Sequence, residues 1–458
     1  MKDLNPIFYP RAIAIVGLPR GFESGRVFLQ GLLDQGYAGK IFPVNPRTEV
    51  IDGLRVYPSL QAIPAEIDQA VILVPAPAVM PVLEECGQKK VKAVVIYTSG
   101  FAESGDEEGK RREEKVQQIA QKMGFYVIGP NCMGVYHPKN HMAFFPGMPR
   151  EPGKVGIISQ SGSLTILLSR LAEPQGVRFS KMVSFGNECD LNSSDFLEFL
   201  GDDPETEVIG AYLEGVKNGP AFFRALKEAS RKKPLIIWQA GRTPGGGKAA
   251  SSHTGSLAGS RFAWEALKEQ SGVLLVKNLE EFADLLSVFY HLPKKVGKRL
   301  AILSGPGGPA VSAADACEEY GLQVAELQAR TWGQLKAILP KAGTSVNNPV
   351  DLGLGSVFEV DLYGRAAACV GLDPGVDALI FQGRGATPRL DINYATLLIE
   401  AQQKVRKPFL AISPGGMVLE PQSVNALIKA GIPVYPSAER AIWAYANLYH
   451  YGEKRFHG

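Results

Sequence analysis

The sequence predicts a parallel α/β protein built from about three domains. Its 458 residues correspond to three domains of about 150 residues each. Short runs of aliphatic and β-branched residues alternate with stretches of helical period along the whole chain, a pattern typical of parallel sheets covered by helices. The 50 glycines and 32 prolines exceed average usage without forming a repeat, so we expect many tight turns and close backbone approaches to a ligand.

The first series of predicted strands ends at a segment rich in proline and glycine, residues 142–153. A helix is predicted directly after the first strand, over residues 26–36. The predicted strands cover residues 12–17, 40–45, 69–75, 92–100 and 125–131.

A second series ends at the charged stretch 292–299, and a third runs from there to a closing helix near residues 439–451. The predicted strands of the second series are 154–159, 179–186, 207–215, 234–241 and 272–278, and those of the third are 300–305, 322–328, 376–383 and 408–416. The two boundaries predict domains over residues 1–142, 143–294 and 295–458.

Composition excludes several classes of protein. Lys and Arg number 49 against 46 Asp and Glu, a net charge of +3, so capture of nucleic acid or of an anionic membrane by charge is not expected. The five cysteines are scattered without a C-x-x-C pair, so neither a disulfide framework nor a metal site is expected. With no secretion signal and no membrane-spanning stretch in the sequence, we expect a soluble, cytoplasmic protein.

Ligands of such sheets bind at the carboxyl ends of the strands, where helix N-termini offer free N–H groups. After the first strand, Gly17, Gly21 and Gly25 have a spacing that differs from the dinucleotide fingerprint, so a phosphate loop and a plain tight turn both stay open. After the second strand, Asn45-Pro46-Arg47 places a cation where an NAD site needs Asp or Glu. Arg47 could meet a phosphorylated ribose or be a solvated surface side chain.

Three features of the second series together predict phosphoryl transfer. His253 lies in a loop of small residues, 245–259, and imidazole is a competent nucleophile near pH 7 because its ordinary pKa is about 6.5. Glu214 ends a predicted strand, where its carboxylate could hold the second ring nitrogen of a phosphorylated histidine. The turn at Ser161 and Gly162 offers N–H groups to a phosphate. Taken singly, each feature is also what an ordinary loop, helix cap or buried acid would show.

The segments VNPR, VPA, SGFAE and GPNCMG occur in this order and resemble the CoA-binding domain of the succinyl-CoA synthetase α-subunit superfamily. The resemblance covers essentially the whole chain and is closest to the α subunit of the ADP-forming acyl-CoA synthetases. It implies an N-terminal Rossmann-like CoA-binding domain followed by two flavodoxin-like succinyl-CoA synthetase-type domains. The chain departs from the family at Leu18-Pro19, where proline offers no N–H group.

The resemblance also implies roles for individual residues. His253 of the S-H-T-G segment would be phosphorylated, Glu214 would stabilise it, and Ser161 and Gly162 would cradle the phosphate, with Asn187 a secondary candidate. The implied CoA contacts are Gly17, Arg20, Gly25, Asn45, Pro46, Arg47, Val74, Pro75, Ser99, Gly100 and Asn131.

The sequence contains no P-loop and no segment of the ATP-grasp kind. Phosphoryl transfer needs Mg²⁺ and a clamp for the nucleotide phosphates, and the resemblance implies that a separate ATP-grasp β subunit supplies them with ADP or ATP, in an assembly of two α and two β subunits. The implied reaction converts acyl-CoA, ADP and phosphate into a carboxylic acid, CoA and ATP, reversibly, through an acyl phosphate and a phosphohistidine. The acyl group is left open.

Two other functions compete with this interpretation. A non-catalytic sensor of CoA or acyl-CoA could keep the fold, although it has no need of the pair His253 and Glu214. A nicotinamide-dependent oxidoreductase is opposed by Arg47, which stands where an acidic residue is expected.

Overall fold

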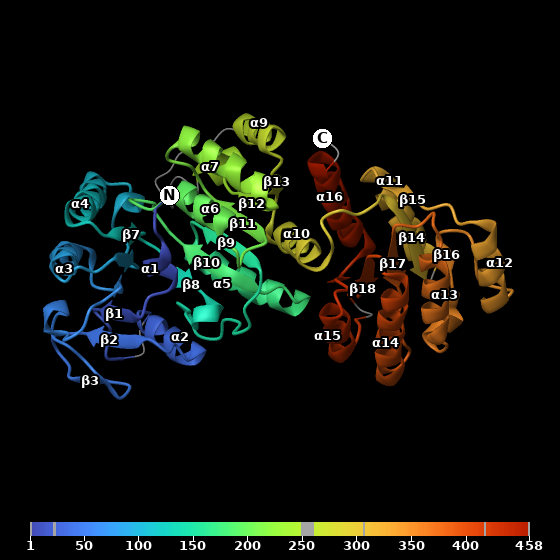
Figure 1. Cartoon of the computed structure of the whole chain (residues 1–458), viewed down its shortest axis with the longest axis horizontal. Coiled ribbons are helices and arrows are strands. Elements are labelled where there is room, and N and C mark those ends of the chain that lie inside the picture. The colour runs from blue at the N-terminus through green and yellow to red at the C-terminus, as the bar shows by residue number, and fades with distance from the viewer. Residues whose placement is uncertain (1, 22–23, 249–260, 306, 416–417, 457–458) are drawn as a thin grey trace. The chain divides into compact units, whose positions relative to one another are not determined.

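The structure is a computed structural model that describes every residue except 1, 22–23, 249–260, 306, 416–417 and 457–458. Its contacts divide the chain into two compact units. The first unit is Met1–Glu173 with Arg178–Leu279, and the second is Pro174–Val177 with Glu280–Gly458. Figure 1 shows the helices and strands of both units, coloured from the N-terminus to the C-terminus.

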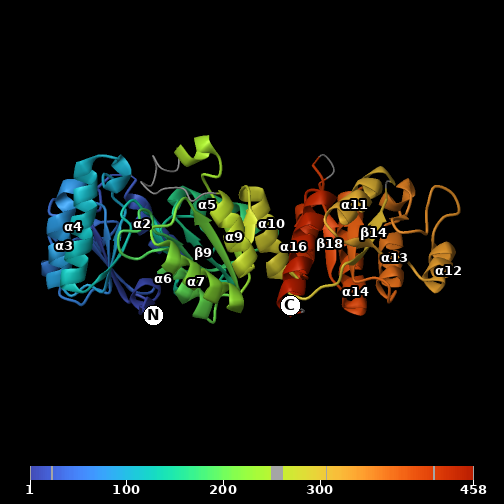
Figure 2. The same cartoon turned by 90° about the horizontal axis from the view of Figure 1, so that it is seen from above.

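The first sheet of the first unit has five parallel strands in the order β2-β1-β5-β6-β7. The strand order turns at β1, so the helix after β1 lies on one face of the sheet and the helices after β5 and β6 lie on the other (Figure 2). Every residue of β1, β5 and β6 is buried, as expected for parallel strands covered on both faces. The elements are β1 (Ala12–Val16), α2 (Arg26–Gln35), β2 (Lys40–Val44), β5 (Gln69–Ile72), α3 (Ala76–Gln88), β6 (Ala93–Ile96), α4 (Glu107–Met123) and β7 (Tyr126–Ile128).

The second sheet of the first unit has six strands in the order β13-β12-β11-β9-β10-β8. Only the edge strand β8 is antiparallel to its neighbour. The strands are β8 (Gly134–Tyr136), β9 (Val155–Ser159), β10 (Phe179–Ser184), β11 (Val208–Leu213), β12 (Leu235–Gln239) and β13 (Leu274–Val276). The helices are α5 (Gly162–Ala172), α6 (Ser193–Asp202), α7 (Gly219–Lys232) and α9 (Arg261–Ser271).

A buried ion-pair network fastens the N-terminal segment to this second sheet. Lys181 on β10 is fully buried, and its Nζ lies 2.9 Å from an Asp203 oxygen and 2.5 Å from an oxygen of Glu205. The Tyr9 hydroxyl, just after helix α1 (Asn5–Phe8), donates to Glu205 at 3.2 Å. The first residues of the chain therefore pack on the second sheet, although they precede the first.

The second unit contains one sheet in the order β15-β14-β17-β18-β19, with β16 also paired to β14. Its strands, all parallel, are β14 (Arg299–Ser304), β15 (Gln323–Val324), β16 (Val350–Asp351), β17 (Ala378–Gln382), β18 (Phe409–Ile412) and β19 (Val434–Tyr435). Its helices are α10 (Leu279–His291), α11 (Gly307–Glu319), α12 (Ala329–Ile338), α13 (Asp361–Gly371), α14 (Pro388–Val405), α15 (Pro421–Lys429) and α16 (Ala438–Phe456).

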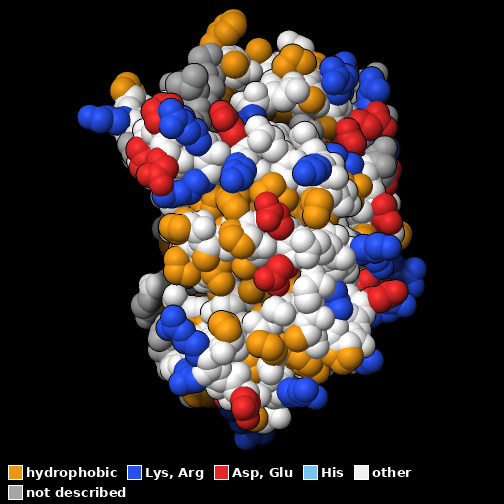
Figure 3. Space-filling view, turned by 90° about the vertical axis from the view of Figure 1, so that its left-hand side faces the viewer, with side chains coloured by type: hydrophobic (Ala, Val, Ile, Leu, Met, Phe, Trp, Pro, Cys, Tyr) orange, Lys and Arg blue, Asp and Glu red, His pale blue; other side chains and the backbone are white. Residues whose placement is uncertain are grey.

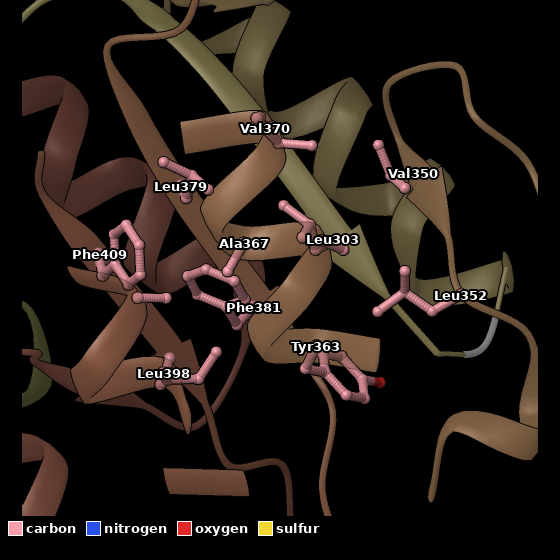
Figure 4. Close-up of a cluster of buried hydrophobic side chains, with 14 of the residues drawn as sticks. Leu303, Val350, Leu352, Tyr363, Ala367, Val370, Leu379, Phe381, Leu398 and Phe409 are labelled. Atoms are coloured by element: carbon pink, nitrogen blue, oxygen red, sulfur yellow. The ribbon is translucent and has the colours of Figure 1, made fainter. Parts of the chain in front are cut away.

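The core of the second unit lies where α13 and α14 pack against the sheet. Side chains of α13 lie in the space between this helix and the strands β14 and β17 (Figure 4). Leu303, Leu379 and Phe381 from the strands meet Tyr363 and Val370 from the helix, and all five are fully buried. The Tyr363 ring packs edge-on against Tyr394 of α14, with 4.9 Å between ring centroids.

The predicted parallel α/β class is confirmed, and each predicted strand overlaps an observed one. The prediction missed β8, β16, β19 and the hairpin of β3 (Val50–Ile51) and β4 (Leu54–Arg55). These strands have two or three residues, too few for a periodic pattern. The predicted domain limits stay a prediction. Residues 134–136, predicted in the first domain, add a strand to the second sheet, and from Glu280 the helix α10 belongs to the second unit.

None of the helices in the described part of the chain has the length and apolar character of a membrane span. Figure 3 shows the side of the first unit on which the first sheet and its helices lie. Basic and acidic side chains are interspersed on this face, with hydrophobic side chains between them.

Candidate active site

The loops that follow the strands of the first sheet hold all the predicted CoA contacts. Because β1, β2, β5, β6 and β7 run parallel, these loops meet at one edge of the sheet. The structure therefore brings together residues that are more than one hundred positions apart in the chain. They are Gly17, Arg20 and Gly25 after β1, Asn45, Pro46 and Arg47 after β2, Val74 and Pro75 after β5, Ser99 and Gly100 after β6, and Asn131 after β7.

Gly17 stands where the end of β1 approaches the end of β5 closely. Its φ is +84°, and a Cβ atom there would lie 2.7 Å from Cγ1 of Val74 and 3.0 Å from the Val74 nitrogen. Only glycine fits this position without a shift of the neighbouring backbone. The side chain of Leu18, the residue at which the chain departs from the family, is fully buried, and its carbonyl accepts from Asn45 Nδ2 at 2.9 Å.

Charged and strained residues complete this edge. Arg20, Arg47 and Ser99 are exposed, so the two guanidinium groups are accessible to a phosphorylated ligand. Gly100, with φ +99°, donates its N–H to Glu103 at 2.6 Å. Asn131 also has a left-handed backbone, φ +58°, and its N–H donates to the Thr98 carbonyl at 3.1 Å.

At the second sheet, the predicted phosphate turn and the predicted carboxylate lie next to each other. Strands β9 and β11 are neighbours, so the turn at Ser161 and Gly162 after β9 and Glu214 after β11 lie at adjacent strand ends. Ser161 is the N-cap of α5, and its side chain accepts from Leu164 N at 3.4 Å. A Cβ on Gly162 would lie 2.3 Å from Met133 Cγ, so the start of the helix packs tightly against the segment between the two sheets.

Glu214 is a buried carboxylate with a tyrosine beside it. Only 5% of the residue is exposed. Burial first, and then the negative charge of Glu214, raise the pKa of Tyr212, so the phenol stays protonated beside the carboxylate. The Tyr212 ring is held edge-on against Trp238 of β12, with 5.0 Å between centroids.

His253 belongs to the segment 249–260, which lies outside the described residues. The described chain leaves the sheet at the carboxyl end of β12, and β12 is the neighbour of β11.

Gln160 joins these elements, although the sequence reasoning did not single it out. Its Oε1 accepts from the N–H groups of Glu214 and Gly215, at 2.5 and 3.1 Å, and its Nε2 donates to the Gly215 carbonyl and to Glu188 Oε1, both at 3.0 Å. The only signal for it in the sequence is its place between β9 and the Ser161 turn.

The loop after β10 connects the two sheets of the first unit. Asn187, the secondary candidate, is 2% exposed and donates from Nδ2 to Glu103 at 2.5 Å and to Glu113 at 2.8 Å. Lys217 donates to Glu113 at 3.0 Å and to the Glu188 carbonyl at 3.2 Å. Asn187 therefore ties the second sheet to the loop that contains Gly100.

Glu188 is the least expected residue of this loop. It is a buried, non-glycine residue with a left-handed φ of +55°. Burial raises the pKa of its carboxyl to about 7, against the opposing charge of Lys217. It lines a polar cavity of about 400 Å³ together with Glu113, Asp190, Ser193 and Lys217.

The cysteines do not form a reactive centre. All five are free thiols, and burial raises the pKa of Cys132, which follows Asn131, to about 12. It is therefore protonated at neutral pH and a poor nucleophile. In the part of the chain that the structure describes, no group of three or more His, Cys, Asp or Glu side chains could hold a metal ion.

Comparison with known proteins identifies the family of the chain. Residues 11–138 match the family model of a CoA binding domain, and residues 152–289 match that of a succinyl-CoA ligase like flavodoxin domain. The acetate–CoA ligase (ADP-forming) II subunit alpha of Pyrococcus furiosus is 40% identical over 445 residues, 95% of each chain. The 4-hydroxybutyrate–CoA ligase (ADP-forming) of Nitrosopumilus maritimus is 34% identical, and the match covers 98% of this chain but 64% of that protein.

A solved structure resembles the whole chain. Acetyl-coenzyme A synthetase 1 of Ca. Korarchaeum cryptofilum, determined in complex with phosphate and ADP, superposes with a TM-score of 0.88 at 34% identity, covering 100% of this chain and 98% of that one. Both family models, the relatives and this structure agree. The chain belongs to the family of the ADP-forming acetate–CoA ligase α subunits.

Proposed function

We propose that this chain is the CoA-binding, phosphohistidine-carrying subunit of an ADP-forming acyl-CoA synthetase. One observation carries the proposal: Glu214, only 5% exposed, and the N-terminus of α5 follow neighbouring strands at one edge of the second sheet. Gln160, directly before that helix, holds the backbone N–H groups of Glu214 and Gly215. A carboxylate and a row of N–H groups are the two supports that a phosphorylated imidazole needs.

The CoA site would lie at the edge of the first sheet. Gly17, Gly25 and Gly100 would let the backbone approach the ligand closely, and Arg20 and Arg47, both exposed, would bind its phosphates. Asn45, Pro46, Val74, Pro75, Ser99 and Asn131 would complete the contacts. CoA supplies the thiol to which the acyl group is bound.

The reaction would proceed in three transfers. Phosphate attacks the thioester carbonyl of acyl-CoA, which forms an acyl phosphate and releases the CoA thiol. The imidazole of His253 then attacks the phosphorus, and the carboxylic acid leaves as its carboxylate. The phosphohistidine finally passes the phosphoryl group to ADP and forms ATP.

Each residue of the second sheet would have one task in these steps. Glu214 would accept a hydrogen bond from the second ring nitrogen of His253, which fixes the tautomer and stabilises the cationic phosphohistidine. Gly162 and the other N–H groups at the start of α5 would hold the phosphate oxygens, and Ser161 would cap the helix and orient them.

A partner subunit would complete the enzyme. ADP, ATP and Mg²⁺ would bind to an ATP-grasp β subunit, in an assembly of two α and two β subunits in the cytoplasm. The lengths of two relatives support a separate partner. The match covers 95% of the P. furiosus α subunit but only 64% of the 4-hydroxybutyrate–CoA ligase, which therefore contains a further part that this chain does not match. The substrate would be a small carboxylic acid, and the domains would follow the limits 1–142, 143–294 and 295–458.

Labelling tests the proposal. The chain is co-expressed with its ATP-grasp partner, and the purified complex is incubated with γ-labelled ATP and Mg²⁺. We expect acid-labile, base-stable label on this chain, lost in His253→Ala and retained in the matched control His450→Ala, a change at an exposed histidine. Absence of label on the wild type, or undiminished label on His253→Ala, would overturn the proposal.

A titration separates the competing functions. We expect the chain to bind CoA and not NAD. Binding of CoA by a wild-type protein that takes up no label would favour a sensor, whereas binding of NAD without CoA would favour an oxidoreductase.

A further inference from the structure

The peptide groups on either side of Glu214 are held by a single side chain. The amide of Gln160 makes four hydrogen bonds, two from Oε1 to the N–H groups of Glu214 and Gly215 and two from Nε2 to the Gly215 carbonyl and Glu188. An amide has two acceptor sites and two donor hydrogens, so this set uses its full capacity. Gln160 is only 4% exposed, so water does not compete with these bonds.

Glu188 supplies the one partner of Gln160 that is a side chain. The other three bonds are to the backbone of residues 214 and 215. If the Glu188 carboxylate is absent, one Nε2 hydrogen is buried without a partner, which weakens the hold of the amide on the backbone groups. Glu188 is therefore one of the groups that fix the orientation of Gln160.

The position of Glu188 is costly, which is typical of a functional residue. A side chain at a φ of +55° is strained. Its carboxyl is buried, and the groups that stabilise its charged form are Lys217, Ser193 and Gln160. The surrounding loop holds the strained backbone from both sides, because Asn187 N donates to the Pro130 carbonyl and Cys189 N to the Gly129 carbonyl, both at 3.0 Å.

We infer that Glu188 is a positioning residue for phosphoryl transfer: through Gln160 it sets the backbone that carries Glu214. The inference rests on the proposed function, in which Glu214 meets the phosphohistidine. The same loop touches the predicted CoA edge through Asn187 and Glu103, whereas the Glu188 carboxylate points to Gln160. Loss of Glu188 will therefore slow phosphorylation while CoA binding is retained.

The test compares three variants in the complex with the ATP-grasp partner. Glu188→Gly removes the carboxylate at a backbone position that glycine adopts without strain. Lys90→Gly is the matched control, because Lys90 is exposed and has a φ of +57°. Glu188→Gln is the rescue variant, because its amide oxygen can accept the same bond from Gln160 Nε2.

We expect the initial rate of His253 phosphorylation to fall about tenfold or more in Glu188→Gly, since small displacements of a supporting group have effects of this order. The rate should stay within roughly twofold of wild type in Lys90→Gly and recover to within about threefold in Glu188→Gln. The CoA dissociation constant should be unchanged in all three variants. Gln160→Ala should slow phosphorylation as much as Glu188→Gly, and the double variant should add little.

Provided that the wild type is labelled, any of three results would overturn the inference. These are a wild-type rate in Glu188→Gly, a rate in Glu188→Gln as low as in Glu188→Gly, and fully additive effects of Glu188→Gly and Gln160→Ala. If Glu188→Gly does not fold, the comparison of Gln160→Ala with Glu188→Gln decides the question, because the inference requires a slow Gln160→Ala and a fast Glu188→Gln. An unlabelled wild type is a different outcome, which rejects the proposed function itself.

Discussion

Gly17, directly after β1, lies close to the backbone of the loop after β5. Replacement by alanine adds a Cβ atom 2.7 Å from Val74 Cγ1 and imposes a left-handed φ of +84°. We expect Gly17→Ala to lower the free energy of unfolding by about 2–4 kcal/mol and to weaken CoA binding. Urea denaturation and a CoA titration measure the two effects.

Gly36→Ala is the matched control for this prediction. Gly36 has a similar φ of +72°, but nothing lies within 4 Å of its Cβ position. Gly36→Ala should lower the free energy of unfolding by only about 1 kcal/mol, which is the strain of a left-handed alanine. Equal losses in the two variants would show that the close approach to Val74 has no effect.

Glu205 gives the first unit a defined pH dependence. Burial alone would raise the pKa of this carboxyl, but hydrogen bonds from Lys139 and Lys181 outweigh burial and lower it to about 2. Because the pKa in the folded state lies below its value of about 4.3 in an unfolded chain, the ion pairs stabilise the fold above that value. This stabilisation is lost as the pH falls from about 4.3 towards 2.

Unfolding free energies at a series of pH values test this dependence. We expect Glu205→Gln to lower the free energy of unfolding by about 1–2 kcal/mol at neutral pH. Between pH 4.3 and 2 the variant should lose stability less steeply than the wild type. Parallel curves for the two proteins over this window would contradict the assignment.

At the scale of elements, Asn348 completes the sheet of the second unit where its strands are too short. Its Oδ1 accepts from Ile302 N at 2.9 Å, and its Nδ2 donates to the carbonyls of Leu300 and Ala325 at 2.8 and 2.9 Å. The side chain thereby satisfies backbone groups of β14 between the two-residue strands β15 and β16.

We expect Asn348→Ala to destabilise the second unit by about 2–4 kcal/mol, because it removes three hydrogen bonds to backbone groups. The Leu300 carbonyl keeps the N–H of Ala325 at 2.8 Å, so the loss falls mainly on Ile302 N and the Ala325 carbonyl. The neighbouring Asn347 is exposed, so Asn347→Ala should change stability by no more than about 0.5 kcal/mol. Chemical denaturation of both variants measures the difference, and equal effects would remove Asn348 from this role.

At the scale of the whole molecule, the division into two compact units predicts more than one step on unfolding. Leu379 on β17 is completely buried in the core of the second unit. We expect Leu379→Ala to lower the free energy of unfolding of the second unit by about 2–5 kcal/mol. In calorimetry, the midpoint of the transition of the second unit should fall while that of the first unit is unchanged.

Leu372, in the same unit, is 67% exposed and provides the control. Leu372→Ala should leave every transition within about 1 °C of the wild type, because a change of about 0.2 kcal/mol at the surface shifts a midpoint by no more than that. A single transition that moves as a whole in Leu379→Ala would show that the two units unfold together.

Much of the fold could be predicted because its signals are local. The aliphatic runs of β1, β6, β9 and β11 are four to six residues long and are flanked by glycine and polar residues, which defines a buried parallel strand within one stretch of sequence. The strand β8 could not be found in this way. It has three residues, and its antiparallel pairing with β10 depends on residues more than forty positions away.

The candidate site divides in the same way. Glu214 and Ser161 could be found because each ends a strand, and strand ends are where parallel sheets bind ligands. Gln160 and Glu188 carried no such signal. Their importance comes from a hydrogen bond across 28 residues, which exists only because β9 lies between β10 and β11 in the sheet.

By itself, the sequence determined the parallel α/β class, the segments that form the strands, and the residues that end them, since these follow from short-range periodicity and from the chemistry of single residues. The tertiary structure decided which strand ends lie side by side, that Asn187 joins the two sheets of the first unit, and that Glu188 reaches Glu214 through Gln160. The physical reason is strand order: neighbouring strands in a parallel sheet are separated in sequence by crossover connections, so contacts between their ends leave no local pattern in the chain.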